Sequence, residues 1–496
     1  MCGGVTGASF SFWLSSYVYS ADDGDENVRD TSLMAIRTIG ALLFVALFAL
    51  FLAQPVLDSG DDRPARLPTV EVSATPDGQA VKVLPSETKT ARRLVNGYPR
   101  ACLRQVQPPS GAGLVAAFDA RGVTIVSTNG DVQATIEDVA PTVRPPIAWS
   151  PSGRVLAVGP QGLFWTPEGA RVPIGDVQHG MVVGARGRWG WSPIADCGAH
   201  IDANGELLIT AVDPGTSTKG GLAVGAGIAL VRPAVESFSF SPDGRSLGLV
   251  IVDGRRREIW VADLERNNMA AVTRFPSSTC CVTLGGWTPD GAELLFWAAS
   301  GASVSADGWL LQSVDPKNRR ISSFTAVRVR PEFLERCAGA LLGIVGGDRF
   351  DVGPMRLAEL QAGAAPRYLT PASESHFRFS CTANGALIAT PRGELRDGSD
   401  PVGSTSRTEV TILRADGSEV ITLTPAGMSD AAPEWGPPGT GLIFVRLSDG
   451  AATVLFAAEG RTPTALGVSV SIPRPDSAWH QVLDWSVTPP DGLPAG

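Results

Sequence analysis

The feature that most constrains this chain is a short module, repeated along most of its length: an aromatic residue, a tight turn and an apolar run. In the clearest copy, within residues 238–264, Phe240 precedes Ser-Pro-Asp-Gly, and an apolar run at 247–252 follows before Asp253 and Gly254 break it. Proline fixes φ at the start of a turn, aspartate bonds its own backbone and glycine accepts positive φ. The pattern predicts β-hairpins. Because an isolated hairpin is marginal in water, the copies must support one another.

The copies recur at the spacing of a repeat protein. Successive intervals are 42, 49, 47, 50, 42, 56 and 50 residues, counting a degenerate copy at Cys337 that lacks the aromatic residue and the proline. One four-stranded blade of a β-propeller occupies roughly 40–50 residues. The aromatic residues that mark the copies are Trp149, Trp191, Phe240, Trp287, Phe379, Trp435 and Trp485. We expect these side chains to pack between adjacent blades, because a four-stranded sheet has two apolar faces to bury.

The repeat therefore predicts an all-β fold, a β-propeller of four-stranded blades. Seven modules separate Trp149 from Trp485, and the segment 101–136 before them contains three or four further strands. The strand at 482–486 can pair with that N-terminal group, so that both chain ends complete one blade. We expect eight blades, with seven as the alternative if one weak module is only a partial blade.

The motifs WSPSGR at Trp149, FSPDGR at Phe240 and WTPDG at Trp287 resemble the WD-like repeats of the TolB family of β-propellers. Three modules match closely, and the remainder of residues 99–490 is assigned by spacing. The resemblance implies an extracytoplasmic propeller that binds proteins or peptides at its face or in its central channel. The same repeat occurs in prolyl-oligopeptidase-type peptidases, but we expect no hydrolase domain here. A propeller fold does not by itself identify a partner.

An apolar segment precedes the repeats. Residues 34–57 begin with Met34, an alternative start of translation, and contain an uncharged apolar stretch at 39–53. Its length lies between a signal-peptide core and a full membrane span, and the end of the stretch fits signal cleavage poorly. We expect an uncleaved signal anchor forming one N-terminal transmembrane helix. The predicted organisation is a disordered tail at 1–33, the anchor at 34–57, a proline-rich extended linker at 58–98, the propeller at 99–490 and a tail at 491–496.

The charge of the chain argues against a nucleic-acid partner. Lys and Arg total 41 against 50 Asp and Glu, which gives a net charge of −9. The basic residues form no stripe of the kind that binds phosphates. Charged residues make up 18% of the chain, whereas it contains 56 Gly and 38 Pro, a composition that suits short strands and turns.

Cysteines indicate the compartment. Six of the seven lie within the expected propeller: Cys102, Cys197, Cys280, Cys281, Cys337 and Cys381. An even number behind an export segment predicts disulfides, although six cysteines allow 15 pairings and buried thiols are the alternative. Adjacent Cys280 and Cys281 should point to opposite faces of a strand. The cysteines contain no C-x₂-C spacing, which is the pattern that would indicate a metal site. Because disulfides form outside the cytoplasm, we expect the propeller to lie on the extracytoplasmic side of the cell membrane, tethered by a single-pass anchor.

No catalytic motif stands out. The four histidines form no H-E-x-x-H pattern, and no Walker loop is present. The string GRSLG at 244–248 fits G-x-S-x-G, but it lies in a predicted hairpin and not between a strand and a helix, so we assign no nucleophile elbow. The one metal-like window contains Asp196, His200 and Asp202, whose side chains could converge on a cation. We favour the alternative that this is a polar loop enlarging a blade turn. We therefore assign no catalytic residue, metal or cofactor.

Two functions remain open from the sequence. The one we favour is a membrane-tethered, extracytoplasmic propeller that binds a protein, peptide or envelope component without catalysis. The alternative is an enzyme, a metal-assisted hydrolase or lactonase whose site lies in the central channel.

Overall fold

A computed structural model of the chain describes residues between 91 and 485. The gaps within this range are 108–112, 120–121, 138–146, 159–162, 166–170, 174–188, 203, 214–222, 225–227, 232–233, 255, 278, 280, 300–308, 347–352, 395–406, 449–450 and 471–482. The predicted tail, anchor and C-terminal tail, and most of the predicted linker, lie outside the described residues. Within the described part of the chain, no helix has the length and apolar character needed to cross a membrane.

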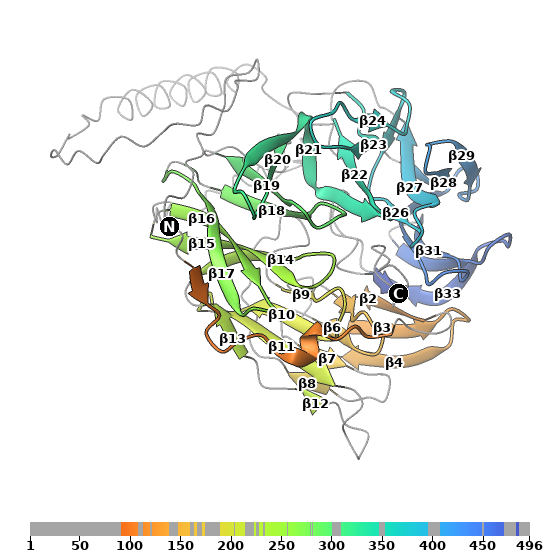
Figure 1. The fold of residues 1–496 in the computed structure, drawn as a ribbon. Coiled ribbons are helices and arrows are strands. Elements are labelled where there is room, and N and C mark those ends of the chain that lie inside the picture. Colours follow the sequence, from red (N-terminus) through yellow and green to blue (C-terminus); the bar gives the residue numbers. More distant parts are fainter. Residues whose placement is uncertain are drawn as a thin grey trace, which may run out of the picture. The chain divides into compact units, whose positions relative to one another are not determined.

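The described residues form strands and one short 3₁₀ helix, η1 (Arg100–Leu103). This confirms the all-β prediction for this part of the chain. All pairings between named strands are antiparallel, and the strands form seven sheets among the described residues (Figure 1).

The first four sheets use the N-terminal half of the described chain and one strand from its end. The first contains β34 (Leu483–Trp485), β2 (Leu114–Asp119), β3 (Gly122–Ser127) and β4 (Val132–Glu137). The second contains β5 (Ile147–Trp149), β6 (Leu156–Val158), β7 (Leu163–Trp165) and β8 (Arg171–Pro173). The third contains β9 (Trp189–Trp191), β10 (Cys197–Ile201), β11 (Leu207–Asp213), β12 (Ala223–Val224) and β13 (Ile228–Val231). The fourth contains β14 (Val235–Phe240), β15 (Ser246–Asp253), β16 (Arg256–Asp263), β17 (Asn268–Arg274) and β1 (Ala91–Arg93).

The remaining three sheets follow in chain order. The fifth has seven strands: β18 (Cys281–Trp287), β19 (Leu294–Ala299), β20 (Trp309–Val314), β21 (Ile321–Cys337), β22 (Ala340–Val345), β23 (Arg356–Leu360) and β24 (Arg367–Tyr368). The sixth contains β25 (Glu374–His376), β26 (Ser380–Cys381), β27 (Leu387–Glu394), β28 (Thr408–Arg414) and β29 (Glu419–Thr422). The seventh contains β30 (Ser429–Trp435), β31 (Leu442–Ser448), β32 (Ala451–Ala457) and β33 (Thr464–Ser469).

The turn between β14 and β15 shows why the repeated motif folds as it does. The Ser241 hydroxyl donates to Asp243 Oδ1 at 2.6 Å, and that oxygen accepts from the Arg245 amide at 3.0 Å. Gly244 has φ of +64°, a conformation that favours glycine, and its amide donates to Ser241 O at 2.9 Å. The same arrangement recurs between β18 and β19, where the Thr288 hydroxyl donates to Asp290 at 2.6 Å. The hairpins predicted from these motifs are therefore present.

Apolar side chains fill the space between successive sheets. One core joins the first, second and seventh sheets through residues such as Val115, Trp149 and Val445. Further cores join the third sheet to the fourth, the fourth to the fifth, the two halves of the fifth, the fifth to the sixth, and the sixth to the seventh. Hydrogen bonds, described next, join the second sheet to the third. The contacts run in a closed cycle, which is the arrangement of a β-propeller.

The repeated aromatic residues lie at these boundaries. The indole of Trp191 donates to Ala148 O at 3.0 Å, and the indole of Trp287 donates to Ser239 O at 3.1 Å. Each acceptor directly precedes the aromatic residue of the preceding module, so the bond ties one sheet to the next. Trp149, Phe240 and Phe379 are buried, whereas Trp191 and Trp435 are half-buried. Trp485 lies in β34 and pairs through its backbone with Val115 of β2.

The N-terminal boundary of the propeller differs from the prediction. Residues 91–98 were expected to be linker, but β1 pairs with β17 and extends the fourth sheet, while Leu94 and Tyr98 are buried in the core. The strand is only three residues long, and two of them are arginines. It therefore carries no alternation of apolar and polar residues, which is the signal that identifies a strand in a sequence.

Two disulfides confirm part of the cysteine prediction. Cys102 bonds Cys197, with Cα atoms 5.6 Å apart, and ties η1 to β10. Cys337 bonds Cys381, with Cα atoms 5.9 Å apart, and ties the end of β21 to β26 of the next sheet. Both link segments that are far apart in the chain, with sequence separations of 95 and 44 residues. Cys281 is half-buried at the start of β18, and Cys280 lies outside the described residues.

Removing the Cys337–Cys381 bond should destabilise the protein without changing its fold. We expect a double change of Cys337 and Cys381 to alanine to lower the free energy of unfolding by about 2–4 kcal/mol, because the unfolded chain then gains freedom. Chemical denaturation followed by circular dichroism measures this loss. Reductant should destabilise the wild type more than the double variant, and an equal effect on both would show that the bond contributes nothing.

Candidate functional site

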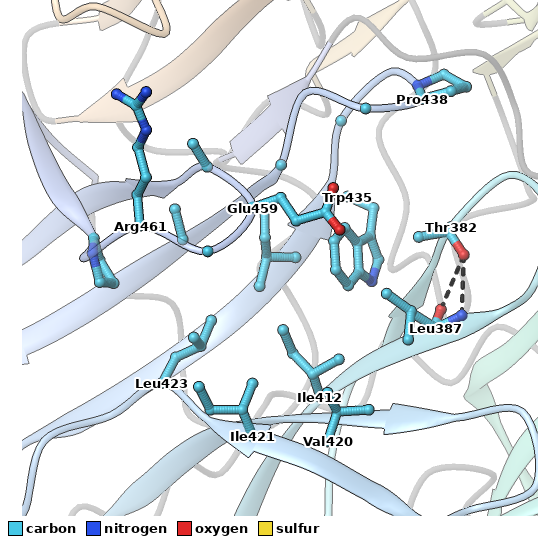
Figure 2. A pocket seen from close by; sticks show the side chains of 18 of the residues that line it. Thr382, Leu387, Ile412, Val420, Ile421, Leu423, Trp435, Pro438, Glu459 and Arg461 are labelled. Atoms are coloured by element: carbon cyan, nitrogen blue, oxygen red, sulfur yellow. Dashed lines mark hydrogen bonds between the residues drawn. The ribbon is translucent and has the colours of Figure 1, made fainter.

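A cavity lies between the sixth and seventh sheets. Its volume is about 970 Å³, near the upper end of the range of roughly 300–1,000 Å³ that is typical of ligand pockets. Its walls come from four segments, namely the β26–β27 turn, β28–β29, the β30–β31 turn and the β32–β33 loop (Figure 2). Sequence reasoning did not identify this cavity.

The β30–β31 turn is where the sequence departs from the repeat. Residues 436–441 read GPPGTG, without the Ser or Thr and Asp pair that fixes the turns at 241–244 and 288–291. Gly441 has φ of +134°, and a Cβ at this position would lie 2.3 Å from the carbonyl oxygen of Ala457. Only glycine permits this approach of two backbones. The departure from the motif is the one sequence signal that could have located the cavity.

Trp435 stands in the wall of the cavity, between Glu459 and Ile412 (Figure 2). Its backbone amide donates to Ser380 Oγ at 3.1 Å. Its indole nitrogen is shielded from solvent and has no hydrogen-bond partner among the described residues. Trp191 and Trp287, at equivalent positions, both donate to a carbonyl of the preceding sheet, whereas the indole nitrogen of Trp149 is buried without a partner among the described residues, like that of Trp435. A buried donor without an acceptor costs about 1–3 kcal/mol, so Trp435 keeps its place in the wall at that cost.

The lining of the cavity is mainly apolar. Ile412 and Leu442 are buried in the core that joins the two sheets, and Leu387 packs against the same core. Val420 and Ile421 on β29 remain 43% and 50% exposed. Large aliphatic side chains exposed beside an apolar cavity favour binding of an apolar group, because binding removes their surface from water.

Two charged side chains lie at the rim, on the loop between β32 and β33. Glu459 and Arg461 are both exposed. Figure 2 shows Glu459 over Trp435, whereas Arg461 points away from it. The rim therefore offers one negative and one positive group to a ligand at separate places.

The predicted metal window does not form a cation site. Asp196 accepts from the Ser152 hydroxyl at 2.7 Å and from the Ser152 amide at 3.2 Å, which joins the third sheet to the second. Asp202 accepts from the amides of Asn204 and Glu206 at 2.9 and 2.8 Å and thereby fixes the β10–β11 turn. His200 is buried in β10, and burial lowers its pKa. Among the described residues, no three His, Cys, Asp or Glu side chains are placed to hold a metal ion.

A carboxyl pair joins the terminal strand to its neighbours. Asp484 on β34 accepts from the Trp149 amide at 2.6 Å and shares a hydrogen bond with Glu434 on β30. Arg378 Nη2 lies 3.9 Å from Glu434 Oε2. Removal from water raises the pKa of Asp484 well above its ordinary value, and the charge of Glu434 raises it further. The position thus favours a protonated carboxyl group where β34 meets the second and seventh sheets.

Comparison with known proteins finds no relative by sequence, since no family model and no curated protein matches the chain. It is similar to solved structures at low identity. A eukaryotic initiation factor is 12% identical with a TM-score of 0.45, covering 76% of this chain and 100% of that one. TolB from Acinetobacter baumannii is 15% identical with a TM-score of 0.31, covering 76% and 67%. Dipeptidyl peptidase 4 from Porphyromonas gingivalis is 10% identical with a TM-score of 0.44, covering 73% and 59%. TolB, which the repeat motifs resemble, is thus among these structures.

Replacing Asp484 by asparagine should change how stability depends on pH. The unfolded chain releases this proton near the ordinary pKa of 3.8, whereas the folded chain retains it to higher pH. The wild type therefore loses stability as pH rises above about 4, until the folded group ionises. Asp484→Asn avoids this loss, so its melting temperature relative to the wild type should rise from pH 4 to pH 8.

Asp416→Asn is the control, because its effect on the pH dependence of stability should have the opposite sign. Hydrogen bonds from Ser418 lower the pKa of Asp416, so this carboxylate stabilises the fold above its unfolded pKa, and the stabilisation is lost as pH falls. Asp416→Asn should therefore be less stable than the wild type at pH 7 and approach it at low pH. Parallel pH profiles for Asp484→Asn and the wild type would contradict the assignment of the proton.

Proposed function

We propose that this chain is an eight-bladed β-propeller that binds an apolar segment of a protein partner, without catalysis, in the cavity between its sixth and seventh sheets. The blade count takes the seven-stranded fifth sheet as two blades that share the long strand β21. The observation that carries the proposal is the 970 Å³ apolar cavity, beside which Val420 and Ile421 remain exposed.

The energetics of such a site favour a segment with large apolar side chains. Burying one Leu, Ile or Phe side chain contributes about 1.5–3 kcal/mol. Two or three such side chains would supply much of the roughly 8 kcal/mol that corresponds to micromolar affinity.

The chemistry of the lining supports binding over catalysis. The lining residues are mainly aliphatic, glycine and proline, and include no histidine, cysteine or serine. Glu459 and the threonines of the lining are the groups that could act as base or nucleophile, and no hydrogen bond joins Glu459 to a threonine among the described residues. Glu459 and Arg461 lie at the rim, where they suit recognition of charge.

We further propose that the apolar segment at 39–53 anchors the chain in the cell membrane, with the propeller on the extracytoplasmic side. The unbroken apolar stretch in the sequence supports the anchor, and the two disulfides support an oxidising compartment.

The anchor predicts a specific fractionation. The full-length chain should stay with membranes washed at alkaline pH, because an apolar helix is held by the bilayer rather than by charge. A protease added to spheroplasts should digest the propeller but spare a cytoplasmic marker. Release of the chain by the wash would argue against the anchor, and protection from the protease would argue against the orientation.

Filling part of the cavity should weaken binding. Ala458 lines the cavity and is half-buried, so Ala458→Trp should occupy part of its volume. The probe is a set of linear 12-residue peptides selected from a phage-displayed library on the full-length chain. Calorimetry should show at least a roughly tenfold weaker affinity for Ala458→Trp, equivalent to the loss of one buried apolar side chain.

Ala365→Trp is the matched control, because Ala365 is exposed and lies outside the lining of the cavity. It should bind the selected peptides within about twofold of the wild type. Equal affinities for the wild type and Ala458→Trp, or no enrichment of peptides over an unrelated protein, would contradict the proposed function.

A further inference from the structure

One strand beside the cavity has an open edge. β29 ends the order of the sixth sheet and pairs with β28, and no described strand pairs with its other side. The Leu423 amide donates to Val410 O of β28 at 2.9 Å, and Thr422 lies opposite Thr411. Amides alternate in direction along an antiparallel strand, so the amide of Thr422 points away from β28. β29 therefore presents backbone hydrogen-bonding groups on its outer edge.

The same strand borders the cavity along most of its length. Val420, Ile421 and Thr422 of β29 contribute to the lining, as does Leu423 directly after the strand. A strand that turned only one face to a cavity would contribute alternate residues, so β29 presents its edge as well as a face. An exposed edge with large aliphatic side chains is also one that proteins usually protect with charge or proline. Val420 and Ile421 instead leave apolar surface exposed at this edge.

The opposite wall complements an extended chain. The β32–β33 loop places Glu459 over Trp435, as Figure 2 shows. No ion pair holds Glu459 among the described residues. A strand lying between β29 and this loop would direct alternate side chains into the cavity. It would also bring a basic residue within reach of Glu459.

We propose that the bound segment is an extended peptide that adds to β29 as a further antiparallel or parallel strand. Alternate apolar side chains of the peptide enter the cavity, and one basic side chain faces Glu459. β29 has four residues, so the paired stretch covers roughly 13 Å, or about four peptide residues. This inference rests on the proposed function and specifies the conformation and chemistry of the partner segment.

The test removes one backbone donor from the edge. Thr422→Pro deletes the outward amide while leaving the bond between Leu423 and β28, and proline is tolerated on the solvent side of an edge strand. Thr422→Val keeps the amide and removes only the hydroxyl. With the peptides selected above, Thr422→Pro should bind roughly tenfold more weakly than Thr422→Val, because a buried peptide carbonyl loses its donor.

Hydrogen exchange supplies a second measurement that does not depend on the stability of the proline variant. In the wild type, bound peptide should slow exchange of the Thr422 amide at least tenfold, whereas the exposed amide of Ala365 should not change. Glu459→Gln should weaken peptides that carry Lys or Arg more than peptides that do not.

The outcomes separate the two proposals. If Ala458→Trp weakens binding but Thr422→Pro binds like Thr422→Val and the Thr422 amide exchanges at its free rate, the cavity binds its ligand without strand addition, and this inference is overturned while the proposed function stands. If Ala458→Trp binds normally, the proposed function itself fails.

Discussion

Three residue pairs between β2 and β34 hold the two ends of the repeat in one sheet, and the remaining packing depends on them. Val115, Ala116 and Ala117 lie opposite Trp485, Asp484 and Leu483. With β34 in place, the first sheet contacts both the second and the seventh, so no sheet is left with an uncovered apolar face at the end of a row. Asp484 strengthens this closure through the Trp149 amide and Glu434, which explains why a carboxyl group lies in a place that disfavours its charge.

The repeated hairpins could be predicted because their signals are local. The Ser241 to Gly244 turn depends on residues within five positions of one another, and the sequence displays all of them. Other features depend on distant chain segments. β1 is fixed by the fourth sheet rather than by its own pattern. The fusion of two modules by β21 depends on register shifts between Val329 and Leu334, and no sequence periodicity encodes such a shift.

The residues proposed from the sequence as a candidate site show the same difference between local and distant contacts. Asp202 makes local turn contacts, but the favoured interpretation of residues 196–202 as one polar loop was wrong, because residues 197–201 form the buried strand β10. The partner of Asp196, Ser152, lies 44 residues away in another sheet, so spacing in the sequence could not distinguish a cation ligand from a link between sheets. The cavity is harder still to predict from the sequence, because its volume depends on the distance between two sheets. The sequence signal for it is the GPPGTG turn, which lacks the Ser or Thr and Asp pair of the turns at 241–244 and 288–291.

The Cys337–Cys381 bond has a mechanical consequence for a protein held at its ends. A pulling force on the termini would first detach β34, whose three pairs carry the load, and successive sheets would then unravel. The 43 residues between the two sulfurs, a separation of 44 positions, could not lengthen under that force, because the covalent bond bypasses them. In an oxidising compartment this bond would therefore remove about one module from the extended length, in addition to the residues that the Cys102–Cys197 bond bypasses, and the sixth sheet would keep its attachment to the fifth under tension.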